Sequence, residues 1–145
     1  MKLITDNRKA WFEYHILDKF EAGIVLVGSE VKSAAEGHMS LGDGFCRVDN
    51  NELWLKNSYI KPYDKGSHYN TPDRQDRKLL LHKHEIRKIA GALRDSGITV
   101  VPLRAYWLKG KIKVEIATVK GKKLHDKRQT IKDRDIERSL RREYK

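Results

Sequence analysis

The sequence predicts a mainly β fold, an antiparallel barrel of about six strands with added helices and a basic C-terminal tail. Three observations predict it. Six short segments have the pattern of strands, a helical pattern is inserted midway without regular β-α alternation, and the apolar periodicity stops at Lys120. We therefore expect one barrel domain over residues 1–119 and a tail over residues 120–145, disordered when free and helical when bound.

The first half of the chain predicts four strands and a short helix. Alternating apolar residues over 11–17 indicate a strand, and the apolar run 24–27, bounded by glycine, indicates a buried one. Residues 30–36 favour a short helix that stops at a glycine. Strands 45–49 and 52–56 flank an Asn-Asn turn, so we expect a hairpin there.

The second half predicts a loop, one long helix and two strands. Residues 57–72 are polar and punctuated by Gly and Pro, and apolar residues recur at helical spacing over 74–96. Strands 98–108 and 111–119 follow, joined by a Lys-Gly turn. Pro102 indicates an edge or a bulge, because proline cannot donate to the ladder. This arrangement is typical of an OB-fold-like barrel.

Net charge points to a polyanionic partner. The formal charge is +11, and residues 120–145 hold 11 Lys and Arg against 5 Asp and Glu, which is over half of the excess. The sequence contains neither an apolar run long enough to span a membrane nor a signal peptide, so we expect a cytoplasmic protein without a membrane partner. Cys46 is the one cysteine, which excludes an internal disulfide and a thiolate zinc site.

Within the tail, the residue pattern predicts a helix that forms on a partner. Thr130 and Asp133 have capping-box spacing, and Ile136, Leu140 and Tyr144 would share one stripe. An isolated helix of this length is marginal, so a partner must supply the remaining stabilisation. The basic residues on the segment favour RNA as that partner.

The sequence predicts no catalytic site, cofactor or metal site. No two of the six histidines have the i, i+4 spacing of a zinc helix, and no glycine-rich phosphate loop is present. Two alternatives stay open. One is a module that recognises ordinary structured RNA, and the other is a magnesium-dependent nuclease that uses the loop carboxylates Asp43, Asp49, Asp64 and Asp73.

Six short motifs, in order and at matching spacing, resemble the SmpB family of SsrA-binding proteins over nearly the whole chain. They are Asn7-Arg8-Lys9-Ala10, Glu21-Ala22-Gly23-Ile24-Val25-Leu26, Glu30-Val31-Lys32-Ser33, Glu52-Leu53-Trp54-Leu55, Arg77-Lys78-Leu79-Leu80-Leu81 and Gly121-Lys122-Lys123-Leu124-His125-Asp126-Lys127-Arg128. Two departures are Ala34-Ala35, where the family commonly has Leu-Arg, and the wider spacing of Arg74 and Arg77.

The resemblance implies an adaptor that grips the transfer-RNA-like domain of transfer-messenger RNA. It would deliver this RNA, as alanyl-tmRNA with elongation factor Tu, to stalled ribosomes. Positions matching Asn7, Glu21 and Leu80 are associated with the RNA interaction in the family. We add Lys32, Arg77 and Lys78 on charge alone, as candidates for phosphate contact.

For the tail, the resemblance implies a helix that enters the vacant messenger channel of the ribosome, at the decoding centre of the small subunit. His125 would stack on a base there, Asp126 would hold the turn, and Lys127 and Arg128 would meet phosphates. The other tail residues expected at the ribosome are Lys122, Lys123, Lys132 and Arg134.

Overall fold

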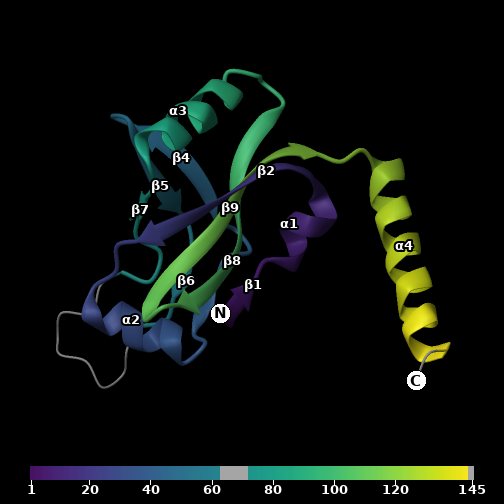
Figure 1. Ribbon diagram of the computed structural model, residues 1–145, viewed down its shortest axis with the longest axis horizontal. Coiled ribbons are helices and arrows are strands. Elements are labelled where there is room, and N and C mark those ends of the chain that lie inside the picture. The colour runs from purple at the N-terminus through teal and green to yellow at the C-terminus, as the bar shows by residue number, and fades with distance from the viewer. Residues whose placement is uncertain (63–71, 144–145) are drawn as a thin grey trace.

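Strands dominate the part of the chain that the computed structural model describes, residues 1–62 and 72–143 (Figure 1). The strands are β1 (Lys2–Asp6), β2 (Tyr14–Ile24), β3 (Met39–Ser40), β4 (Phe45–Asp49), β5 (Glu52–Lys56), β6 (Tyr59–Ile60), β7 (Arg77–Leu80), β8 (Ile98–Leu108) and β9 (Lys111–Gly121). The helices are α1 (Arg8–Glu13), α2 (Gly28–Ala35), α3 (Lys83–Ala92) and α4 (Leu124–Glu143).

The main sheet is antiparallel and curls into a barrel. Its strand order is β1-β8-β9-β2-β7-β5-β4, and β4 at the far edge also lies against β8. Strands β8, β9, β2, β7, β5 and β4 thus surround one core, while β3 and β6 pair separately. The predicted mainly β fold with a barrel of about six strands and added helices is confirmed.

Alternation along the strands separates the core from the outer surface. On β9, Val114 and Ile116 are fully buried in the core, whereas Lys113 and Glu115 point outward, as their sequence pattern predicts. A second, smaller cluster forms outside the barrel, where Ala10 of α1 packs near the β8 and β9 residues. Helix α1 therefore covers one end of the outer sheet surface.

Two turns and one bulge have the geometry that the sequence predicts. Asn50 and Asn51 have φ of 50° and 61°, and Lys109 and Gly110 have φ of 51° and 77°. Positive φ at both central residues matches the right-handed twist of the flanking strands, so both hairpins turn tightly. Pro102 lies at a register shift between β8 and β9, which confirms the predicted bulge.

The predicted strand over 11–17 begins too early. Residues up to Glu13 belong to helix α1, because the side chain of Asn7 accepts a hydrogen bond from Ala10 N and starts a helix there. The predicted buried strand over 24–27 is also wrong after Ile24. Val25 and Val27 are 51% and 46% exposed, and the chain turns into α2 at Gly28.

The predicted long helix over 74–96 is the largest error. Residues 77–80 form strand β7 between β2 and β5, and the helix α3 starts only at Lys83. Leu79 is buried, yet in the sheet and not on a helix face. Helix α3 begins after His82, whose N–H donates to the Glu85 side chain, so this helix start lies inside the predicted element. Apolar spacing alone does not separate a strand of four residues from a helix that follows it so closely.

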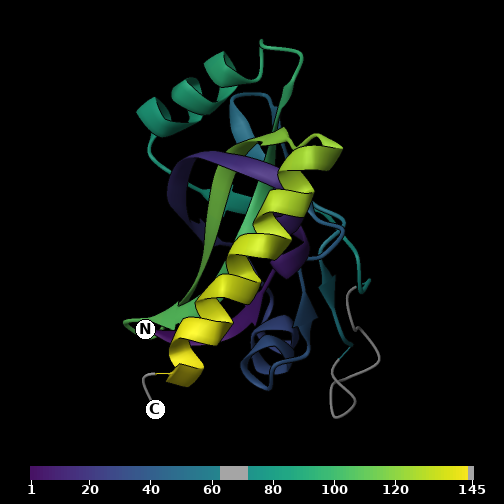
Figure 2. The same ribbon diagram turned by 90° about the vertical axis from the view of Figure 1, so that its right-hand side faces the viewer.

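The tail contains the predicted helix, and the helix starts earlier than expected. Strand β9 runs to Gly121, and α4 begins at Leu124, six residues before Thr130. Figure 2 shows α4 as a rod beside the barrel on the side of α1, and the two helices contact one another. The start of α4 contacts α1 through the hydrogen bond from Lys122 N to Glu13 O and contacts β2 through Asp126 and His15. The expectation that the tail is disordered when free stays a prediction.

Candidate nucleic-acid interface

The outward side chains of β7, β2, β9 and β8 form one continuous surface, called the sheet face below. Cross-strand pairing sets its rows: Glu21 is opposite Glu115, and Glu115 is opposite Arg104. Two residues further along β2, on the same face, Leu80 is opposite Gly23, Gly23 is opposite Lys113, and Lys113 is opposite Tyr106. The sheet face consists of Lys78, Leu80, Glu21, Gly23, Lys113, Glu115 and Arg104, together with Tyr106, which is only 3% exposed beneath them.

Glu21 is an exposed carboxylate held by a tyrosine. The Tyr106 hydroxyl donates a hydrogen bond of 2.5 Å to Glu21 Oε2. Burial raises the pKa of Tyr106, and the hydrogen bond to Glu21 and the negative charges of Glu21 and Glu115 raise it further. Tyr106 therefore stays a donor, which orients Glu21 and leaves its other oxygen to accept hydrogen bonds from base amino or ribose hydroxyl groups.

Arg104 compensates the negative charge of Glu115, the second carboxylate of the row. Its Nη2 donates to Glu115 Oε2 at 3.3 Å, and its Nε lies 3.3 Å from Glu115 Oε1. Without this pair, Glu115 and Glu21 would place two negative charges on facing positions of β9 and β2. The arrangement keeps the sheet face compatible with a negatively charged ligand.

Leu80 is an exposed apolar side chain at the end of the sheet face. It is 52% exposed and lies over Gly23, where an added Cβ would stand 3.3 Å from Leu80 Cβ. Beside it is a cavity of about 340 Å3 at the open end of the barrel, with Trp107 and the cations Lys111 and Lys113 in its lining. An apolar surface bordered by an indole and two ammonium groups suits nucleobases and the phosphates between them.

Lys78 and Lys32 stand on accessible positions. Lys78 Nζ is 3.1 Å from Glu52 Oε2, and both side chains are about 40% exposed, so the pair is weak and can exchange for a phosphate. Lys32 is exposed on α2. Both positions are accessible to a phosphate.

Arg77, in contrast, is a buried structural residue, and the expectation of a phosphate contact is contradicted. Its side chain is 1% exposed, and its Nε and Nη2 lie 2.8 and 2.7 Å from Glu30 Oε2. Nη1 donates to the carbonyl and hydroxyl oxygens of Ser58, and Nη2 donates to Asp73 O. The guanidinium ties β7 to α2 and the chain around β6, and no donor faces a ligand.

Asn7 is also buried, so its side chain does not reach the surface. Its Nδ2 donates to Pro102 O at 2.7 Å and to Leu41 O at 3.3 Å, while its Oδ1 caps α1. These bonds join α1, the segment before β4 and the bulge of β8 at the place where the barrel closes. Asn7 therefore has a structural role, holding α1, Leu41 and Pro102 in place.

At the opposite end of β2, the start of α4 is fixed to the barrel. Lys122 N donates to Glu13 O at 2.8 Å, and Lys122 Nζ donates to Trp11 O and Thr130 Oγ1. Asp126 Oδ2 accepts from Lys123 N and lies 3.1 Å from His15 Nε2. Asp126 thereby holds the turn into α4. Its expected role at the decoding centre stays a prediction.

Aromatic contacts extend this anchoring along the first turns of α4. The Lys127 Nζ and Arg134 Cζ atoms stand 5.8 and 6.0 Å from the centre of the Phe12 ring, within cation–π range. The predicted ribosome contacts Lys123, Arg128, Lys132 and Arg134 are exposed on or next to α4. The His125 side chain lies outside the described residues.

The described ranges, 1–62 and 72–143, contain no cluster of metal-ligating side chains. No three His, Cys, Asp or Glu side chains gather there as a metal site would require. Burial raises the pKa of the Cys46 thiol, which makes it a poor nucleophile. Of the carboxylates considered for a nuclease, Asp64 lies outside the described residues, and Asp43 forms an ion pair with Lys9.

Sequence reasoning missed Tyr106, Trp107, Lys113 and Phe12 as site residues. The alternation of β9 places Lys113 on the outer face, but it does not say which strands lie beside β2, and β8 has no such alternation to mark Tyr106. Pairing across the barrel brings Glu21, Tyr106, Lys113 and Leu80 together. Phe12 was assigned to a strand and not to α1.

Comparison with known proteins agrees with this geometry. The family model described as SmpB protein matches residues 4–145. SsrA-binding proteins of Coprothermobacter proteolyticus and Trichodesmium erythraeum are 55% and 52% identical, covering 100% and 99% of this chain and 98% and 93% of their own lengths. A chain from the solved structure "tmRNA-SmpB: a journey to the center of the bacterial ribosome" superposes with a TM-score of 0.70 at 45% identity, covering 83% of this chain and 85% of that one. The chain belongs to the SmpB family.

Proposed function

We propose that this protein is an RNA-binding adaptor that binds the transfer-RNA-like domain of transfer-messenger RNA and brings it to stalled ribosomes for trans-translation. Family membership supports it, as do relatives named SsrA-binding protein and a similar chain from tmRNA-SmpB work on the bacterial ribosome. One observation supports separate sites for transfer-messenger RNA and for the ribosome. The sheet face and the start of α4 lie toward opposite ends of β2, so that Glu21 and Gly23 are about 20–30 Å along the strand from His15 and Tyr14.

The sheet face is the proposed transfer-messenger RNA site. Glu21 accepts hydrogen bonds from the RNA, Leu80 packs on a base or ribose, and Lys78 and Lys32 meet phosphates. Asn7 acts indirectly, because its hydrogen bonds hold α1 and the bulge of β8 where β4 meets β8. Arg77 takes no part in contact, since Glu30 and backbone carbonyls use its donors.

The tail is the proposed ribosome contact. Helix α4 enters the vacant messenger channel and places its cations along the small-subunit RNA at the decoding centre, with His125 stacked on a base. Elongation factor Tu accompanies alanyl-tmRNA in the delivery complex, and this part rests on family membership alone. The proposed tail contacts are Lys122, Lys123, His125, Asp126, Lys127, Arg128, Lys132 and Arg134.

In this proposal the protein performs no chemistry and acts in the cytoplasm. The dispersed carboxylates and the buried Cys46 of the described part support an adaptor over a nuclease. Among the described helices, none is both long and apolar enough to cross a membrane. Absence of RNA cleavage at every magnesium concentration is the expected result, and chelator-sensitive cleavage would favour the nuclease.

Leu80→Ala tests the sheet face directly. The side chain is half exposed, so its removal leaves the fold intact and is expected to weaken transfer-messenger RNA binding by about tenfold, the loss for one base or ribose contact. Leu17→Ala is the matched control, because Leu17 is 48% exposed on the same β2 strand but outside the sheet face. Equal binding by both variants, measured by gel shift, would contradict the assignment.

Truncation after Gly121 tests the tail while it keeps β9 whole. We expect the truncated protein to bind transfer-messenger RNA like the intact one and to fail in peptide tagging on ribosomes stalled without a stop codon. Loss of RNA binding would instead make the tail a basic clamp. Competition with ordinary transfer RNA separates this adaptor from a general structured-RNA module, which would bind both RNAs equally.

A further inference from the structure

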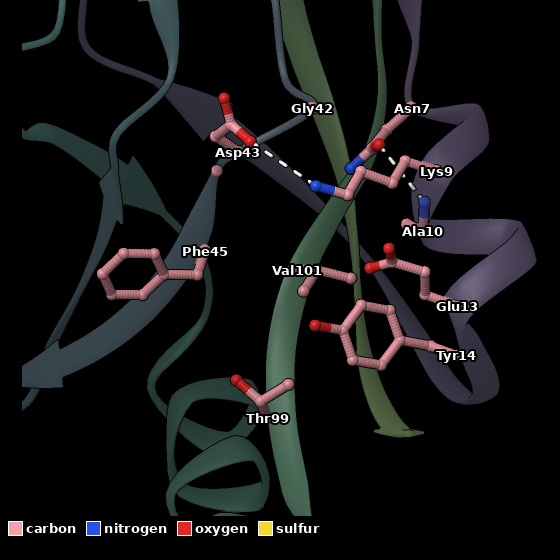
Figure 3. Close-up of a pocket in the computed structure, with 11 residues that line it drawn as sticks. Asn7, Lys9, Ala10, Glu13, Tyr14, Gly42, Asp43, Phe45, Thr99 and Val101 are labelled. Atoms are coloured by element: carbon pink, nitrogen blue, oxygen red, sulfur yellow. Dashed lines mark hydrogen bonds and ion pairs between the residues drawn. The ribbon is translucent and has the colours of Figure 1, made fainter. Parts of the chain in front are cut away.

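A second cavity, away from the sheet face, opens beside the start of the tail. It has a volume of about 350 Å3, within the range of small-ligand sites. Helix α1 and the first residue of β2 form one wall, residues 42–45 form the other, and β8 forms the floor with Thr99 and Val101 (Figure 3). Lys9 and Asp43 form an ion pair of 3.6 Å across it.

The cavity has aromatic walls. Phe45 is 43% exposed, an unusual position for a phenyl ring, and stands on one side of the cavity. Tyr14 stands on the other, with its hydroxyl directed inward (Figure 3). Figure 3 shows the Phe45 ring turned away from Tyr14 and Val101. Because this ring is exposed, rotation about χ1 can bring it over a flat, aromatic ligand that enters the cavity.

Polar side chains without a partner among the described residues line the same space. Glu13 is half-buried, and its carboxylate makes no hydrogen bond or ion pair with any described residue. The hydroxyl groups of Tyr14 and Thr99 are likewise unpaired within residues 1–62 and 72–143. Because no described residue uses the Glu13 carboxylate, both of its oxygens are available to accept hydrogen bonds from a ligand that brings donors.

We propose that this cavity binds one unpaired guanine of an RNA strand. A carboxylate is acceptor-only and takes two parallel hydrogen bonds. Guanine is the base whose Watson–Crick edge offers two adjacent donors, N1–H and the N2 amino group, whereas adenine, cytosine and uracil place an acceptor beside each donor. Glu13 binds that edge, Phe45 stacks on the ring, and Tyr14 donates to an acceptor of the base.

The position of the cavity places this guanine at the tail end of the molecule. Glu13 O accepts the hydrogen bond from Lys122 N, so the base lies next to the start of α4, at the other end of β2 from Leu80. The proposal rests on the proposed function only in that the ligand is RNA. The guanine site adds a base-specific contact to the proposed contacts between tail cations and RNA phosphates.

The test measures binding of the intact protein to labelled single-stranded RNA pentamers by fluorescence anisotropy at low salt. The pentamers are uridines with guanine, inosine, adenine or uracil in the centre. We expect guanine to bind about tenfold more tightly than adenine or uracil. Inosine lacks the N2 amino group, so it is expected to fall between guanine and the other bases. Equal affinity for all four pentamers would overturn the proposal.

Variants assign the preference to Glu13. Glu13→Gln replaces the acceptor pair by an amide and is expected to abolish the preference for guanine, whereas Glu36→Gln makes the same charge change on the exposed end of α2 and keeps it. Phe45→Leu, which removes the stacking ring but no charge, is expected to weaken all pentamers alike. A preference that survives Glu13→Gln in a folded protein refutes the assignment.

Chemical probing then identifies the source RNA. The reagent kethoxal reacts with N1 and N2 of unpaired guanine, so the bound base is protected by the intact protein and exposed again with Glu13→Gln. Protection in transfer-messenger RNA or in small-subunit RNA names the source, and protection in neither overturns the proposal. Gel shifts with transfer-messenger RNA and Leu80→Ala report on the sheet face separately, so failure of one proposal does not imply failure of the other.

Discussion

Replacing Arg77 by methionine should destabilise the fold and leave the RNA surface unchanged. The guanidinium is 1% exposed, and it is the charge partner of Glu30, whose side chain is 4% exposed. Removing one member of such a pair leaves an uncompensated buried charge, which costs about 3–5 kcal/mol. Ser58 O and Asp73 O also lose their donors, which places Arg77→Met toward the upper end of that range.

Thermal and urea unfolding measure this loss. For a chain of this length, each kcal/mol lowers Tm by about 3 °C, so we expect a fall of about 10–15 °C with an unchanged urea m-value. Lys78→Met is the control: it removes a cation from the next residue of β7, but the pair with Glu52 is about 40% exposed and is worth less than about 1 kcal/mol.

A double variant isolates the charge effect. Arg77→Met with Glu30→Met removes both buried charges and should recover part of the stability lost by the single variant. Below the lowered Tm, Arg77→Met should bind transfer-messenger RNA like the intact protein, because no guanidinium donor faces solvent. A destabilisation below about 1 kcal/mol, or a binding loss in the folded variant, would refute the assignment of Arg77 as a purely structural residue.

Three other measurements follow from the site. Asn7→Ala should lower the free energy of unfolding by about 2 kcal/mol, since it removes a helix cap and two buried hydrogen bonds; chemical denaturation checks this, and a change near zero would contradict the closure role. The Tyr106 pKa is raised, so its contribution to stability is complete below the ordinary tyrosine pKa of about 10 and is lost as pH rises further. Tyr106→Phe should therefore flatten the alkaline decline of stability, and an identical decline in both proteins would exclude Tyr106 as its source. Lys78→Ala should reduce the salt slope of RNA binding by about one, whereas an unchanged slope would exclude a phosphate contact there.

Local patterns in the sequence were sufficient for elements defined by a turn and a strict alternation. The hairpin of β4 and β5 and the hairpin of β8 and β9 agree with prediction to within two residues, because Asn50-Asn51 and Lys109-Gly110 accept positive φ and the strands beside them alternate. The basic tail and its helical character were likewise readable from residues 120–145, since charge and i, i+4 spacing are local properties.

The sequence by itself determined the fold class, the charge and, through its motifs, the family. Tertiary structure decided which side chains are exposed on the outer face, because burial depends on what packs against a strand and not on the residue's own type. Arg77 and Lys78 are neighbours in sequence and both basic, yet Glu30 of α2 buries the first while the second stays exposed. The same reason separates Asn7, enclosed where the barrel closes, from Glu21 and Leu80, which strand pairing brings to one outer face.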